Sequence, residues 1–89
     1  MERNIQRGFI KKLSKIGFAR KISAENYAGM PDVLFVLSGC VYFLELKTLE
    51  GKVSKVQQHT IDMINYCGGD ARILRGSGEM EAFINEITN

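Results

Sequence analysis

The sequence predicts one α/β domain over residues 1–89, with elements in the order α-β-β-β-α-β-α around a small mixed central sheet. Three observations lead to this prediction: apolar residues at helical spacing, two short β-branched and aromatic runs, and a Ser-Gly turn between those runs. A chain of 89 residues has material for one hydrophobic core. Its 45% hydrophobic and 25% charged residues are ordinary for a globular domain and exclude disordered and fibrous classes.

The first half of the chain predicts a helix, a strand and a hairpin. Residues 2–16 are helical because Ile5, Phe9, Leu13 and Ile16 recur at spacings of four, four and three. Residues 18–23 read as a strand and residues 24–30 as a polar loop. Residues 33–37 and 41–46 form two strands around a Ser38-Gly39 turn. Their near-continuous hydrophobicity predicts that both faces of the hairpin are covered.

The second half predicts a helix, a strand and a last helix. Residues 54–67 begin with the S-x-x-Q capping box of Ser54 and Gln57. The inward stripe of this helix is predicted to contain Val56, Thr60, Met63, Ile64 and Cys67. Residues 71–75 predict a strand, and the helix after residues 76–78 is expected to bury Met80, Phe83, Ile84 and Ile87.

Charge is distributed unevenly along the chain. Residues 1–21 carry seven Lys or Arg side chains and one acid, whereas residues 22–89 carry five bases and nine acids. The basic segment is either a contact surface for a polyanion or a solvated helix face. No signal peptide or membrane span is predicted, and Cys40 and Cys67 form no metal or redox motif, so we expect a cytoplasmic protein without a membrane partner.

The predicted hairpin brings charged residues together at one end. With a two-residue turn, positions whose numbers sum to 77 face one another, so Asp32 lies opposite Glu45; a three-residue loop would shift this register. Two opposed carboxylates repel, and Lys47, on the same face as Glu45, offsets the repulsion only in part. A divalent cation would offset it better, with the backbone carbonyl of Leu46 as a further ligand.

Each charged residue also has a plain structural interpretation, as a solvated strand end or a surface ion pair. Their combination on one face instead favours phosphodiester hydrolysis. In that chemistry two carboxylates hold a metal that activates water, and an ammonium group stabilises the developing negative charge.

These residues resemble the PD-(D/E)XK nuclease superfamily, with Pro31-Asp32 as the PD and Glu45-Leu46-Lys47 as the E-x-K. The helix beginning at Glu2, the Gly29-Met30-Pro31-Asp32 segment and the Ser54–Gln57 helix start resemble the VRR-NUC family, the virus-type replication-repair nucleases. The resemblance implies a restriction-endonuclease-like fold and an Mg²⁺- or Mn²⁺-dependent endonuclease. The implied metal ligands are Asp32, Glu45, the Leu46 carbonyl and Glu2, directly or through water; the implied catalytic residues are Glu2, Asp32, Glu45, Lys47 and Gln57.

Two of these roles have alternatives, since Glu2 also suits a helix N-terminus and Gln57 a capping box. The family resemblance implies a homodimeric Holliday-junction resolvase, phage-encoded and acting in a bacterial cytoplasm. A flap or nicking nuclease and a catalytically silent junction-binding module stay open. Expected DNA contacts are Arg3, Arg7, Lys11, Lys15, Arg20 and Lys21, and expected dimer contacts include Tyr42, Tyr66, Phe83 and Ile87.

Overall fold

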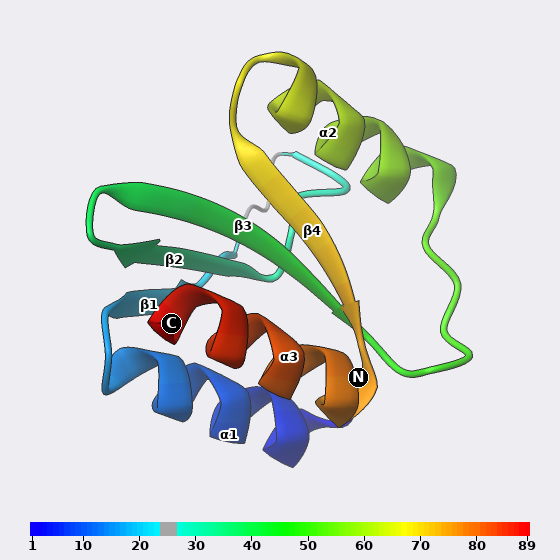
Figure 1. Cartoon of the computed structure of the whole chain (residues 1–89). Coiled ribbons are helices and arrows are strands. Elements are labelled where there is room, and N and C mark those ends of the chain that lie inside the picture. Colours follow the sequence, from blue (N-terminus) through cyan, green and yellow to red (C-terminus); the bar gives the residue numbers. More distant parts are fainter. Residues whose placement is uncertain (24–26) are drawn as a thin grey trace.

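The computed structural model describes residues 1–23 and 27–89, and its elements follow the predicted order (Figure 1). Part of the predicted polar loop at residues 24–30 lies outside the described residues. The elements are α1 (Arg3–Ser14), β1 (Phe18–Lys21), β2 (Val33–Leu37), β3 (Cys40–Lys47), α2 (Lys55–Tyr66), β4 (Asp70–Arg75) and α3 (Gly76–Thr88). The last helix begins directly at Gly76. Gly76 and Gly78, expected to precede the helix, therefore lie in its first turn.

The strands form one mixed sheet in the order β1-β2-β3-β4. The first two neighbouring pairs are antiparallel, whereas β3 and β4 are parallel and are joined through α2. Helices α1 and α3 lie together on one face of the sheet, and α2 packs along β4 on the other face (Figure 1). The sheet therefore has an α1/α3 face and an α2 face.

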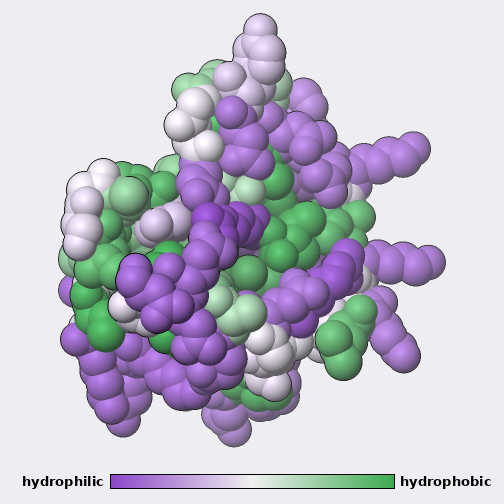
Figure 2. All heavy atoms as spheres, in the orientation of Figure 1, coloured by the Kyte–Doolittle hydropathy of each residue, from purple (hydrophilic) through white to green (hydrophobic). Residues whose placement is uncertain are grey.

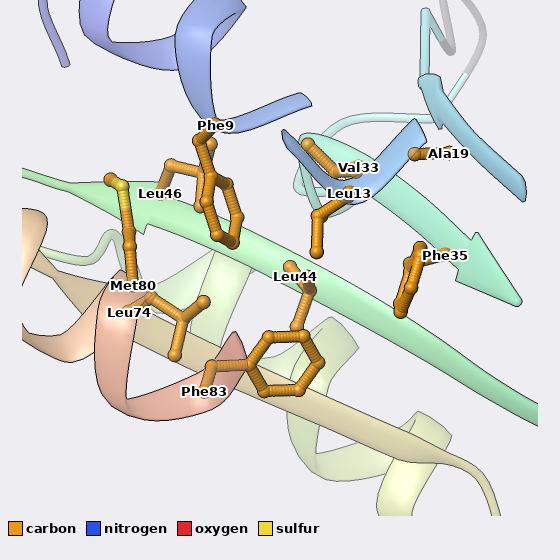
Figure 3. Close-up of a cluster of buried hydrophobic side chains, with 10 residues drawn as sticks. All are labelled: Phe9, Leu13, Ala19, Val33, Phe35, Leu44, Leu46, Leu74, Met80 and Phe83. Carbon is orange, nitrogen blue, oxygen red and sulfur yellow. The ribbon is translucent and has the colours of Figure 1, made fainter. Parts of the chain in front are cut away.

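The main hydrophobic core lies on the α1/α3 face. Figure 3 shows Phe9 and Leu13 of α1 pointing toward the strands, where they meet side chains such as Leu44 and Leu46 of β3. The remaining members of this cluster are Ala19, Val33, Phe35, Leu74, Met80 and Phe83. Because side chains alternate along a strand, the residues between these core positions point to the α2 face.

The hairpin has the predicted register. Leu37 pairs with Cys40 and Val33 with Leu44, so the paired numbers sum to 77. Ser38 and Gly39 both have positive φ, 51° and 82°, as a two-residue type I′ turn requires. The turn chemistry and the pairing thus agree.

Several packing predictions are wrong. In α2 the buried residues are Thr60 and Ile61, whereas Val56, Met63 and Cys67 are exposed. The helix is turned so that Gln57 points inward toward the sheet, where it bonds Glu45. The hairpin is not covered on both faces, because α2 lies over β4 and leaves Val41 near the turn 44% exposed.

The prediction that Phe83 contacts a second subunit is wrong, because Phe83 is a core residue with 3% exposure. Tyr42 is half-buried and stacks on Phe35, whereas Tyr66 is exposed.

Gly29 brings the segment before β2 against the start of α2. Its φ is +86°, and a Cβ built on it would lie 2.6 Å from Val56 Cγ1 and 2.8 Å from the Val56 carbonyl oxygen. Only glycine tolerates both this backbone conformation and this close approach. The contact places the segment leading to Asp32 beside the helix that carries Gln57.

Candidate active site

Asp32, Glu45 and Lys47 share the α2 face of the sheet. Leu44 and Leu46 point into the core, so Glu45 and Lys47, which alternate with them along β3, point to the other side. The hairpin register places Asp32 beside this part of β3, and its Oδ2 accepts a hydrogen bond from the Leu46 amide at 2.8 Å. The juxtaposition predicted from register is therefore observed.

Glu45 is the centre of the site and is 2% exposed. Its Oε2 accepts a hydrogen bond from Gln57 Nε2 at 3.1 Å and lies 3.5 Å from Lys47 Nζ. Its Oε1 is buried and has no hydrogen-bond partner among the described residues. A buried carboxylate oxygen without a partner is costly, so Oε1 has hydrogen-bonding or ligating capacity that the described residues do not use.

Burial, and after it the nearby negative charge of Asp32, raise the pKa of Glu45, while Lys47 lowers it; the net result is a pKa of about 7. The two acids and the lysine are thus electrostatically coupled. The net upward shift shows that the positive charge of Lys47 does not fully compensate for burial and for Asp32.

Gln57 connects the site to the start of α2. Its Oε1 accepts from the Ser54 amide at 3.0 Å, and the Ser54 hydroxyl accepts from the Gln57 amide at 3.1 Å. Both bonds of the capping box are therefore present, while Nε2 of the same side chain remains free to bond Glu45. Gln57 thus completes the capping box and also contacts Glu45; its catalytic role stays a prediction.

The donor set suits a hard divalent cation that keeps several waters. It contains two carboxylates, one of them with an unpartnered oxygen, and oxygen ligands are those that Mg²⁺ and Mn²⁺ prefer. Within residues 1–23 and 27–89, no three His, Cys, Asp or Glu side chains are grouped closely enough to hold a metal. Backbone carbonyls, water or substrate could supply further ligands.

Glu2 does not join Asp32 and Glu45 in such a group. It is exposed, and its carboxylate accepts hydrogen bonds from the amides of Asn4 and Ile5 at 2.9 and 3.2 Å. The structure thus shows the helix-capping alternative for Glu2. Its metal role, like that of the Leu46 carbonyl, stays a prediction.

The expected DNA-binding residues are divided between the two faces. The α1 bases lie on the helix that covers the α1/α3 face, whereas Arg20 alternates with the core residue Ala19 and lies on the α2 face. The guanidinium of Arg20 is 4.6 Å from the centre of the Phe18 ring. Their DNA contacts stay predictions.

Sequence reasoning missed Arg75. It pairs in register with Lys47, so both side chains leave the same face of neighbouring strands. Its guanidinium donates a hydrogen bond to the Gly51 carbonyl, which ties down the turn that follows Lys47. The parallel pairing of β3 and β4 was needed to find it, and no local sequence pattern gave that pairing.

The sheet is mixed, Pro31-Asp32 leads into β2, and Glu45-Leu46-Lys47 ends the neighbouring strand β3. A solved structure described as "VRR_NUC domain" matches this chain with a TM-score of 0.83, 22% identity, and coverage of 92% of this chain and 91% of that one. Comparisons with protein-family models and with curated proteins give no match. The chain therefore has the fold of a VRR_NUC domain, which confirms the predicted fold.

No helix among the described residues is both long and apolar enough to cross a membrane.

Proposed function

We propose that this chain is a VRR-NUC nuclease: a metal-dependent, structure-selective DNA endonuclease that hydrolyses phosphodiester bonds. The observation that carries the proposal is Glu45, a buried carboxylate with one unpartnered oxygen, beside Asp32 and Lys47. A buried acid whose pKa is raised to about 7 and that contacts specific charged partners is typical of functional sites. The fold shared with a VRR_NUC domain supports the same conclusion.

Asp32 and Glu45 would hold Mg²⁺ or Mn²⁺, with Leu46 contributing its carbonyl and Glu2 a direct or water-mediated contact. The bound cation would supply Lewis-acid activation of the phosphoryl group and lower the pKa of a coordinated water. Asp32 is oriented for this task by the Leu46 amide, and Glu45 by Gln57.

Lys47 supplies the positively charged side chain of the site. Its Nζ lies 3.5 Å from Glu45 Oε2, and its side chain is 19% exposed, so the ammonium is held in place yet can reach a substrate. In this position it orients the attacking water or stabilises negative charge on the phosphate. Gln57 holds the Glu45 carboxylate through Oε2, which leaves Oε1 without a partner among the described residues.

The proposed substrate is branched DNA, in particular a four-way junction cut by a homodimer in the cytoplasm of a bacterial host. A two-fold pair would present two active sites to two strands of a four-way junction. The family resemblance supports the same arrangement.

The test is cleavage of labelled DNA of four shapes: a four-way junction, a flap, a fork and a linear duplex. Each is incubated with Mg²⁺, Mn²⁺ or chelator, with wild type and Lys47→Ala. We expect paired symmetric cuts in the junction, dependent on metal and absent in Lys47→Ala, and sedimentation as a dimer. Cleavage of flaps alone would make the chain a flap nuclease, and tight binding without cleavage under either metal would make it a silent binding module.

A further inference from the structure

Four basic residues form one line on α1, which we call the basic stripe: Arg3, Arg7, Lys11 and Lys15. They are spaced by four residues and therefore lie on one side of the helix. Phe9 and Leu13, the buried residues of α1, point from the opposite side into the core. The basic stripe consequently faces away from the sheet.

The stripe and the candidate active site lie on opposite sides of the molecule. α1 covers the α1/α3 face, whereas Asp32, Glu45 and Lys47 lie on the α2 face. The sheet lies between α1 and the side chains of the candidate active site. A straight duplex that contacts the active site cannot also lie along the stripe.

The stripe is exposed and available for an anion. All four side chains are exposed, and none of them forms an ion pair with another described residue. Lys12, the neighbour of Lys11, instead bonds Glu81 of α3 at 2.5 Å. In Figure 2 hydrophilic side chains gather over the lower part of the view, where Figure 1 places α1.

The dimensions of the stripe match a nucleic-acid backbone. At 1.5 Å per residue it extends over roughly 18 Å, and one strand of duplex DNA presents about five phosphates along that length. The edge strand β1 contacts α1, and it carries Arg20 toward the α2 face and Lys21 toward the α1/α3 face. Positive charge thus continues around the β1 edge from one surface to the other.

We propose that the basic stripe is a second DNA-binding surface, which holds a duplex arm other than the one at the active site. The proposal rests on the proposed nuclease function, because only a branched substrate offers a second arm on the far side of the sheet. It gives a physical reason for selectivity by DNA shape: a linear duplex satisfies one surface, whereas a branched molecule satisfies both.

The first experiment compares Lys11→Gln with Lys12→Gln, which remove the same charge from adjacent residues of one helix. Binding to a labelled four-way junction is measured by fluorescence anisotropy in chelator, over a range of salt. Loss of one phosphate contact makes the slope of log K against log salt shallower by about 0.9. Between 50 and 200 mM salt, the variant should therefore lose about 3.5-fold less affinity than wild type. We expect this loss in Lys11→Gln, and in Arg7→Gln, but not in Lys12→Gln.

The second experiment combines these variants with DNA from which one arm has been removed. If the stripe holds that arm, its removal abolishes the effect of Lys11→Gln, so the two changes are not additive. If the effects of Lys11→Gln and of arm removal on binding add for every arm, no removed arm contacts the stripe. That result would overturn the proposal. An unchanged salt slope in both stripe variants would show a solvated helix face and would also overturn it.

Failure of this proposal can be distinguished from failure of the nuclease proposal, because binding is measured without metal. A chain that cuts no DNA, but whose salt-slope loss in Lys11→Gln disappears when one arm is removed, would keep the second surface and lose the enzyme. A chain that cuts junctions, with identical slopes in all variants, would keep the enzyme and lose the second surface.

Discussion

The side-chain amide of Gln57 bonds two parts of the fold at once. Its oxygen accepts from the Ser54 amide at 3.0 Å, and its nitrogen donates to Glu45 Oε2 at 3.1 Å. The residue that caps α2 therefore also orients the central carboxylate of the site. The start of this helix and the geometry of the active site are coupled through one side chain.

The two roles of Gln57 can be separated by Gln57→Glu. A glutamate at this position still completes a capping box, but it replaces the donor to Glu45 with a third acid. We expect a loss of about 1–3 kcal/mol of stability at neutral pH and a decrease in cleavage of about 10- to 100-fold. Denaturant unfolding and single-turnover cleavage measure the two effects.

The control is Gln58→Glu, since Gln58 is exposed and its side chain bonds only Asp62 among the described residues. Equal loss of cleavage in both variants would show that the bond to Glu45 has no special role.

The stability of the metal-free protein should depend on pH through Glu45. Its folded-state pKa of about 7 exceeds the ordinary 4.5, so between these values the folded chain retains a proton that the unfolded chain has lost. Stability from this group is therefore complete below pH 4.5 and falls as the pH rises toward 7, by about 3 kcal/mol in total. Glu45→Gln should remove this component.

The contribution of Glu45 to the free energy of unfolding is measured by urea unfolding in chelator at pH 5 and pH 8. It is the difference between wild type and Glu45→Gln at each pH. We expect the variant to be the more stable protein at pH 8. A variant with the same pH dependence as wild type would contradict the raised pKa.

Divalent metal should reverse this destabilisation. Mg²⁺ or Mn²⁺ binds the ionised form of Glu45, so at saturating metal the midpoint of thermal unfolding should rise in wild type and stay constant in Glu45→Gln. Because metal must displace a proton below pH 7, its affinity should increase about tenfold per pH unit as the pH approaches 7 and level off above it. Titration calorimetry in two buffers of different ionisation enthalpy detects the released proton; binding without proton release would argue against Glu45 as a ligand.

Gly29→Ala should disturb the site through the backbone. The added methyl group meets Val56 at 2.6–2.8 Å, and the φ of +86° is unfavourable for alanine, so we expect a loss of at least about 1–3 kcal/mol. Gly8→Ala is the matched control, because Gly8 lies within α1 with no other atoms near its added Cβ and should gain about 0.5–1 kcal/mol. Denaturant unfolding of both variants gives the sign of each change, and a neutral Gly29→Ala would show that the Val56 contact relaxes freely.

Local patterns were sufficient for much of the fold and for the centre of the site. The two-residue turn at Ser38-Gly39 sets the hairpin register, and the register brings Asp32 to β3 beside Glu45 and Lys47. The capping box likewise places the start of α2. These features depend on residues close in sequence or directly paired, so counting along the chain predicts them.

Side-chain contacts between distant elements needed the tertiary structure. The rotation of α2 that buries Ile61 and exposes Met63 depends on how the helix docks on β4. The position of Arg75 beside Lys47 depends on a parallel pairing reached only through that helix.

The sequence by itself determined the order of elements, the hairpin register and the residue types of the site. The tertiary structure decided that Glu45 is buried with an unpartnered oxygen and that the basic stripe lies across the sheet from the carboxylates. The physical reason is that periodicity and turn geometry are local properties of the chain. Burial, pKa and the face that a helix covers are set by packing between segments that are distant in sequence.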